Sequence, residues 1–296
     1  MSQKDSKSTL IIKSSGAGAI SGIITKTTVA PLERIKILYQ LQGMMGPEKR
    51  YNSLFGSAQT IIKEEGFRGL FRGNGANIAR ILPNYTLKFM FNDTYKRAVC
   101  RSGQSLKEMS FTQLIQAGWL AGVSQASITY PLDMVRTRLT MDNKMSGGHR
   151  GILGTLKNCV QTEGIRGLYK GYSMTFLSTP VYIGLQMSLF DIFKRQLADS
   201  EGNTHPVRSF VAGACAGLIA QSTAYPGDTI RKQLQSNGMG GKEKQYSGLL
   251  DCIRQIYKRG GMKGFYPGIG VNTIKCIPEA GLQFVIYDQV RAAMDL

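Results

Sequence analysis

The chain has 296 residues, of which 37 are basic and 19 are acidic, so its formal net charge is +18. This balance favours an anionic partner, either nucleic acid, an acidic lipid surface or a small anion. Five cysteines without a CxxC pair and two isolated histidines argue against a disulfide framework, a metal site and a catalytic triad. We therefore expect no cofactor, no bound metal and no enzymatic chemistry.

The N-terminal segment 1–8, MSQKDSKS, is short and polar. It has no apolar signal-peptide core, and its mixed charges make a poor arginine-rich presequence. If the protein enters an organelle, we expect the targeting information to lie within the remaining chain.

A proline motif then recurs three times, as APLERIK, YPLDMVR and YPGDTIR, around Pro31, Pro131 and Pro226. Each proline is followed two residues later by an acid and five residues later by a cation. These pairs are Glu33 and Lys36, Asp133 and Arg136, and Asp228 and Arg231. A landmark that returns at a nearly fixed period predicts a threefold structural repeat.

Three further landmarks keep the same register. Two glycines precede each proline, at 18 and 22, 118 and 122, and 213 and 217; a marker follows it, EGFRGLFRG, EGIRGLYKG or GGMKGFYPG. Each repeat closes with an acid and a cation three residues apart, Asp93 and Lys96, Asp191 and Lys194, or Asp288 and Arg291. The chain thus divides into repeats 9–100, 110–198 and 206–293, which form one domain over 9–293.

Each repeat is expected to contain a long helix, a short helix and a second long helix. The first long helices cover about 9–40, 110–141 and 206–237, with small residues that allow close helix packing. The second cover about 73–99, 171–198 and 268–293, long enough to cross a bilayer. Segments 51–66, 151–164 and 246–261 have the apolar spacing of amphipathic helices at a membrane surface. The expected fold is an all-α membrane protein with six transmembrane helices.

The triplicated Px[DE]xx[KR] motif with its glycine-rich marker resembles the mitochondrial carrier family over essentially the whole chain. The resemblance implies a monomeric, pseudo-threefold bundle with its short helices on the matrix side and one central site. It also implies exchange between cytosol-facing and matrix-facing states. The family location is the mitochondrial inner membrane, although a hydrogenosome, mitosome or peroxisome membrane would use the same scaffold. An anionic lipid such as cardiolipin is the expected lipid partner of the matrix-side helices.

The resemblance also implies two gates made of ion pairs. The matrix gate would pair Glu33 with Arg136, Asp133 with Arg231, and Asp228 with Lys36; Gln40 and Gln235 would brace it, whereas Thr140 in the second repeat cannot. The cytosolic gate would pair Asp93 with Lys194, Asp191 with Arg291, and Asp288 with Lys96. Exposed ion pairs are worth only about 0–1 kcal/mol each, which suits a gate that must also open.

A group of cations indicates the substrate. An ionisable side chain in a membrane helix costs about 2.5–3.5 kcal/mol on insertion scales unless it meets water or a partner. Lys26, Arg80, Lys88 and Lys275 lie in three of the expected helices, with Glu279 as the one nearby acid. This excess favours an anion with several negative charges, such as a phosphorylated compound. Arg80 and Lys275 match the family's substrate-contact positions, while Lys88 is alternatively a lysine that extends to the interface.

Within the family, TKTTVAPLERIK and RGNGANIARILPNYTLKFMFNDTYK look most like the nucleotide-transporting branch. This implies an antiporter of ADP and ATP; coenzyme A, ATP-Mg with phosphate, or another multivalent anion is the alternative. Ser178 and Thr179 stand where adenine-nucleotide carriers usually have a glycine and an aliphatic residue. Tyr182, one turn later, either stacks on a base or packs between helices. Three registered acid and cation pairs argue against a soluble nucleic-acid-binding protein.

Overall fold

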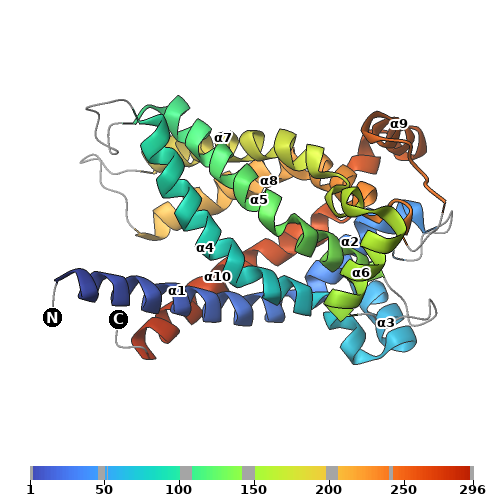
Figure 1. Cartoon of the computed structure of the whole chain (residues 1–296), viewed down its shortest axis with the longest axis horizontal. Helices are drawn as coiled ribbons and strands as arrows, with labels where there is room; N and C mark the ends of the chain where they lie inside the picture. The colour runs from blue at the N-terminus through green and yellow to red at the C-terminus, as the bar shows by residue number, and fades with distance from the viewer. Residues whose placement is uncertain are drawn as a thin grey trace.

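The computed structural model describes residues 3–45, 51, 53–100, 109–141, 151–197, 206–239 and 243–293. Nearly all of these residues are helical, and no strand occurs in these ranges. Both histidines, His149 and His205, lie outside them. The expectation of an all-helical chain is confirmed for the described residues (Figure 1).

The long helices agree with the sequence expectation to within a few residues at most ends. Their bounds are α1 Gln3–Thr28, α2 Ala30–Leu41, α4 Asn74–Val99, α5 Phe111–Met141, α7 Tyr172–Gln196, α8 Pro206–Ser236 and α10 Ile269–Ala293. The first expected helix differs in two respects. It begins already at Gln3, and it divides at Val29 because this residue leaves helical geometry just before Pro31 starts the next turn.

The long helices form a closed ring in chain order. α1 contacts α4, α4 contacts α5, α5 contacts α7, α7 contacts α8, α8 contacts α10, and α10 returns to α1. Three of them also meet across the ring, because α2, α5 and α8 contact one another. Since these three carry the proline motifs, the ring is drawn together where the motif charges lie. We call this the closed end of the ring.

Three short helices lie at the closed end, opposite the chain termini (Figure 1). They are α3 Leu54–Glu65, α6 Gly151–Glu163 and α9 Leu249–Gly260, and each is followed by a 3₁₀ turn, η2 Phe67–Phe71, η5 Ile165–Tyr169 and η7 Gly261–Phe265. Their positions confirm the predicted short helices. The first turn of each helix has an apolar, strongly exposed residue, Phe55 at 85%, Leu153 at 81% and Leu250 at 81%. Each short helix therefore turns an apolar side chain away from the ring.

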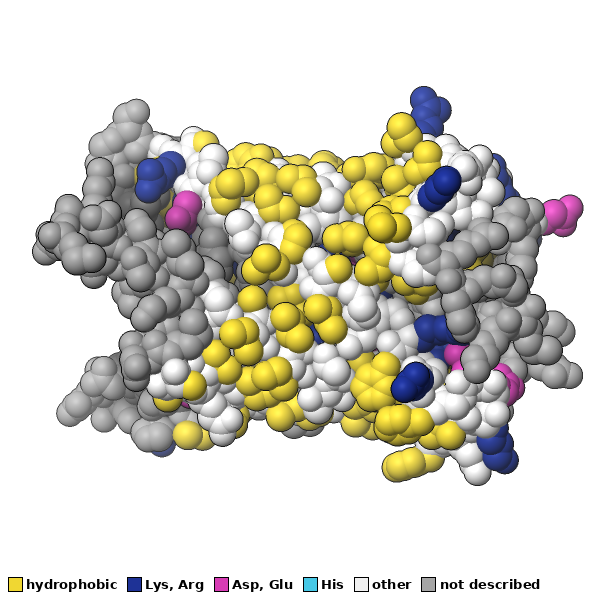
Figure 2. Space-filling view, turned by 60° about the horizontal axis from the view of Figure 1, so that its bottom comes forward, with side chains coloured by type: hydrophobic (Ala, Val, Ile, Leu, Met, Phe, Trp, Pro, Cys, Tyr) yellow, Lys and Arg dark blue, Asp and Glu magenta, His cyan; other side chains and the backbone are white. Residues whose placement is uncertain are grey.

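The outer surface also has an apolar character. Figure 2 shows hydrophobic side chains across the middle of one face, with the visible charged side chains mainly toward the two ends. Within the described ranges, one helical stretch, Ile165–Gln196, is long and apolar enough to cross a membrane by length and composition.

Glycines set how closely the ring closes. Gly73, Gly171 and Gly268 begin the second long helix of each repeat with φ of 84°, 78° and 78°, a backbone conformation that favours glycine. A Cβ on Gly73 would lie 3.1 Å from the Arg136 carbonyl oxygen of α5, and one on Gly171 would lie 2.9 Å from the Arg231 carbonyl oxygen of α8. Each of these glycines therefore lets a second long helix start directly against the end of a motif-bearing helix.

Two helical prolines leave carbonyl groups that aromatic side chains then satisfy. Proline lacks the N–H that would bond the carbonyl four residues earlier. Pro180 so frees the Phe176 carbonyl of α7, which accepts a hydrogen bond from the Trp119 indole of α5 at 3.3 Å. Pro131 frees the Ser127 carbonyl, which accepts from the Tyr169 hydroxyl at 3.2 Å. Both bonds tie helices within the second repeat.

Candidate functional site

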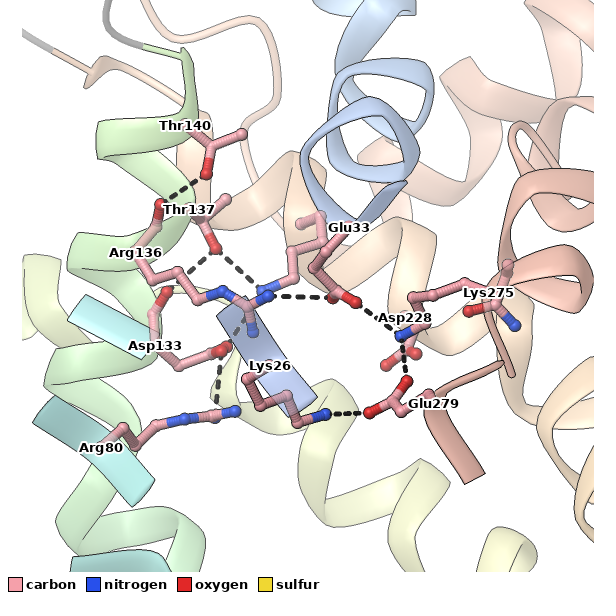
Figure 3. A network of polar contacts seen from close by, with 12 residues as sticks. Lys26, Glu33, Arg80, Asp133, Arg136, Thr137, Thr140, Asp228, Lys275 and Glu279 are labelled. Carbon is pink, nitrogen blue, oxygen red and sulfur yellow. Dashed lines mark hydrogen bonds and ion pairs between the residues drawn. The ribbon is translucent and has the colours of Figure 1, made fainter. Parts of the chain in front are cut away.

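The motif charges gather on the inner side of the closed end, where α2, α5 and α8 meet (Figure 3). The first of them, Glu33, joins three helices. Its Oε1 is 3.0 Å from Arg136 Nη2 of α5, which is the pair that the family resemblance implies. Its Oε2 accepts a hydrogen bond from Lys275 Nζ of α10 at 2.5 Å. Glu33 therefore ties α2 to both neighbours.

The second acid, Asp133, has partners different from the expected one. Its expected partner was Arg231, but Oδ2 lies 3.1 Å from Lys232 Nζ and Oδ1 lies 3.1 Å from Arg80 Nη1. The Asp133–Arg231 pairing is therefore wrong for this structure. Lys232 takes its place because that side chain is almost fully buried and points to α5.

Gln235 supports this second corner. Its amide nitrogen donates to Asp133 Oδ2 at 3.0 Å, and its amide oxygen accepts from Thr137 Oγ1 at 2.8 Å and from Lys232 Nζ at 3.2 Å. This geometry is that of a brace beneath an ion pair. Gln40 differs, since its buried side-chain nitrogen has no hydrogen-bond partner within the described part of the chain. Thr140 bonds its own helix, donating to the Arg136 carbonyl at 2.9 Å.

In the described part of the chain, the third corner has no ion pair between helices. Arg231 lies 3.1 Å from Asp228 on the same helix, α8. Lys36, the expected partner of Asp228, instead has its ammonium 5.3 Å from the centre of the Tyr225 ring. Across the described residues no ion pair joins Lys36 to Asp228, so this implied pairing is also wrong for this structure. The ring of charges is consequently asymmetric.

Three of the proposed substrate cations lie in the same network, but none of them is unpaired. Lys26 of α1 forms an ion pair with Glu279, and Lys275 lies 3.1 Å from the other oxygen of Glu279. Lys275 also bonds Glu33, and Arg80 bonds Asp133. The expected excess of unpaired cations is therefore wrong for this state, in which each cation already has a carboxylate.

The remaining proposed substrate residues lie apart from this network. Lys88 is exposed on α4, about two turns beyond Arg80. Ser178 and Thr179 donate to their own helix, to the Met174 and Thr175 carbonyls, each at 2.6 Å. Their carbon atoms pack against glycines of α8 and α5. Tyr182 is half-buried on α7.

At the opposite end of the ring, which we call the open end, the expected gate residues are accessible to solvent. All of them are exposed except Lys96, which is half-buried: Asp93, Asp191, Lys194, Asp288 and Arg291. The ion pairs Asp93–Lys194 and Asp288–Lys96 are absent from the described structure, and the Lys194 ammonium lies 6.0 Å from the Phe190 ring centre. The charges implied for the matrix gate are thus buried or half-buried, whereas those implied for the cytosolic gate are exposed apart from Lys96.

The sequence interpretation missed the ion pairs that anchor two of the short helices. Glu65 lies 2.7 Å from Arg34 Nη2 and 2.9 Å from Arg72 Nη1. Glu163 pairs in the same manner with Arg138 and Lys170. Burial acts to raise the pKa of Glu163, but the hydrogen bonds from Arg138 and Lys170 hold it below its ordinary value. These pairs could have been found from the glutamate that begins two of the three markers, Glu65 and Glu163. The third marker has Gly260 at that position.

Comparisons with known proteins agree with the repeat pattern. The family model described as "Mitochondrial carrier protein" matches residues 7–103, 107–201 and 202–295. The mitochondrial adenine nucleotide transporter ADNT1 of Arabidopsis thaliana is 33% identical, over 95% of this chain and 86% of its own. The mitochondrial coenzyme A transporter SLC25A42 of Danio rerio is 34% identical, over 94% and 86%. ADP/ATP translocase 3 of Homo sapiens is 33% identical, over 93% and 95%. Relatives named for different substrates are therefore similar to nearly the same degree.

Proposed function

Since the chain belongs to the mitochondrial carrier family, we propose that it is an antiporter that exchanges ADP and ATP across an organelle inner membrane. The six long-helix units of the ring would each cross the bilayer, and the short helices would lie on the matrix side. The unit of transport would be the monomer. The mitochondrial inner membrane is the proposed location, with a hydrogenosome, mitosome or peroxisome membrane as the alternative.

The observation that carries this proposal is the contrast between the closed and open ends on either side of the Lys26, Arg80 and Lys275 cluster. Such a cluster suits a substrate with several phosphate groups, because charged oxygens form strong hydrogen bonds with ammonium and guanidinium groups. If phosphate groups bind Lys275 in place of Glu33, and Arg80 in place of Asp133, two contacts of the closed end are broken. Their binding energy would offset the cost of opening, so that the substrate shifts the population toward exchange.

The residues of the two gates keep their proposed roles, with different partners at the closed end. Glu33, Arg136, Asp133, Lys232 and Gln235 would carry the matrix gate in this state. Lys36, Asp228, Arg231 and Gln40 would take part in it only after rearrangement. The exposed charges of the open end would form the cytosolic gate when that end closes.

Coenzyme A is the second candidate substrate, because the coenzyme A transporter of Danio rerio is as similar as the nucleotide carriers. Both molecules carry phosphates, so the cation cluster suits either. The short helices suggest a lipid partner, since each exposes an apolar residue at its start. We propose that they rest on the matrix leaflet, where an anionic lipid such as cardiolipin would match the positive chain.

The test is transport by purified protein in liposomes. We expect labelled ADP uptake to require internal ADP or ATP and to be inhibited less by coenzyme A, ATP-Mg, phosphate or tricarboxylates. Lys26→Ala, Arg80→Ala and Lys275→Ala should each abolish exchange, whereas Arg254→Ala, which changes an exposed cation of α9, should not. Exchange retained in all three cluster variants would contradict the proposed site, and preferential uptake of coenzyme A would replace the proposed substrate.

A further inference from the structure

Glu279 of α10 is the one acid of the cation cluster that belongs to neither gate motif. Its two carboxylate oxygens contact two different lysines (Figure 3). Oε1 pairs with Lys26 of α1, and Oε2 lies 3.1 Å from Lys275, one turn earlier on α10. Glu33 and Asp133 join motif-bearing helices to their neighbours, whereas Glu279 joins the two lysines to each other. The tie between α1 and α10 needs only the contact with Lys26, so it does not explain the second contact with Lys275.

Lys26 is the most exposed side chain of the cluster, and Arg80 follows at 25%. The Lys26 side chain is 36% exposed and the Glu279 side chain is 21% exposed, whereas Lys275 is 7% exposed and Asp133 is 5% exposed. An anion that enters the ring can therefore reach Lys26 and Glu279 while Lys275 and Asp133 are still largely covered. A carboxylate and a phosphate also offer ammonium groups the same kind of charged oxygen acceptor.

We propose that Glu279 occupies the position of a substrate phosphate between Lys26 and Lys275 while the site is empty, and that its charge selects how many phosphates the site accepts. This inference rests on the proposed function and deepens it. A bound phosphate pairs with the two lysines in place of Glu279, but the Glu279 side chain is part of α10 and stays close to the site. Its negative charge then repels the substrate, and the repulsion grows with each further phosphate.

The consequence is a site in which the charge of Glu279 limits the preference for longer phosphate chains. Without Glu279, Lys26, Arg80 and Lys275 would favour the substrate with the most negative charge. With Glu279 present, the difference in affinity between a substrate of intermediate charge and the most highly charged substrate becomes smaller. Glu279 is in this sense a specificity-determining residue, and it also ties α1 to α10 in the empty protein.

The experiment measures the thermal stabilisation of detergent-purified protein by phosphate, pyrophosphate and tripolyphosphate. Removal of the negative charge weakens this repulsion, so Glu279→Gln should raise the ratio of tripolyphosphate to phosphate affinity by roughly tenfold, which corresponds to about 1.4 kcal/mol. Without ligand, the same variant should melt at a lower temperature, because the α1–α10 tie is lost. Glu243→Gln, which changes an exposed acid outside the helices, should alter neither quantity.

A variant with a shorter carboxylate, Glu279→Asp, distinguishes selection by charge from a purely structural role of Glu279. Glu279→Asp loses part of the contact to Lys26 but keeps the negative charge, so it should melt early and still keep the wild-type affinity ratio. An unchanged ratio in Glu279→Gln, or equal ratios in the Gln and Asp variants, would overturn the inference. Because the probes are inorganic, these outcomes hold even if liposome transport shows that the wild-type substrate is not an adenine nucleotide, a result that would count against the proposed function alone.

Discussion

The two ends of the helix ring carry the same sequence pattern in different surroundings. At the closed end, Asp133 and Arg136 lie three residues apart on one helix, and both are buried with partners on other helices. At the open end, Asp93 and Lys96 have the same spacing, but Asp93 is exposed and Lys96 is half-buried. The pattern marks where charges lie along a helix, whereas the approach of neighbouring helices decides whether they are paired.

This difference has energetic consequences. Breaking a buried ion pair by removing one partner costs about 3–5 kcal/mol, because the other charge stays buried without compensation. An exposed pair is worth about 0–1 kcal/mol. Substitutions at the two ends should therefore differ severalfold in their effect on stability, and this separation can be measured.

The largest effect is expected for Asp133→Ala. The substitution leaves Lys232 and Arg80 without their shared acid, so we expect a loss of about 3–5 kcal/mol in the free energy of unfolding. The matched substitution Asp191→Ala at the open end should stay within about 0.5 kcal/mol. Chemical unfolding in detergent measures both values. Equal losses would show that burial does not distinguish the two ends.

A smaller effect is expected from acid at the anchor of α6. The pKa of Glu163 is lower in the folded protein than in the unfolded chain, where it is about 4.3. Its stabilisation is therefore complete above that value and is lost as the pH falls through the folded pKa. Hydrogen exchange at pH 7 and at about pH 3 should show α6 losing protection relative to α9, whose marker begins with Gly260.

The control for this pH effect is Glu163→Gln. It removes charge-assisted hydrogen bonds worth about 1.5–3 kcal/mol and should give low protection of α6 at both pH values. Loss of protection at about pH 3 in this variant as large as in the wild type would assign the effect to another group.

The smallest effect is expected for Arg231→Ala. Arg231 pairs with Asp228 on its own helix, and the two side chains are 23% and 32% exposed. We therefore expect the pair to contribute about 0–1 kcal/mol to unfolding. If Arg231 were instead the main partner of Asp133, as the family resemblance implies, the loss would approach that of Asp133→Ala. The same unfolding measurement decides between these pairings.

Much of the fold could be predicted from the sequence, because the repeat gives each landmark three independent positions. The short helices and the second long helices follow from apolar spacing. The Glu33–Arg136 pair was also correctly implied. These features depend on local sequence or on a symmetry that the motifs share.

The partners of Asp133 and Glu279 could not be predicted in the same way. Lys232 is the sixth residue after Pro226, where the other repeats have Ile37 and Thr137. The repeated motif therefore has no cation at this position, and a prediction based on threefold symmetry misses Lys232. Neighbouring helix residues point about 100° apart, and only the contact between α5 and α8 shows which one reaches Asp133. The contact between Lys26 and Glu279 joins residues 253 apart in sequence, and it requires the ring to close.

The bond from Trp119 to the Phe176 carbonyl has a practical consequence. Trp119 is the one tryptophan of the sequence, so all tryptophan fluorescence of the protein comes from a single indole at the contact of α5 with α7. Its ring also lies 4.9 Å from the Phe176 ring. If α5 and α7 separate during a transport cycle, the indole loses its acceptor and the emission wavelength shifts. The protein therefore carries its own optical reporter of movement within the second repeat.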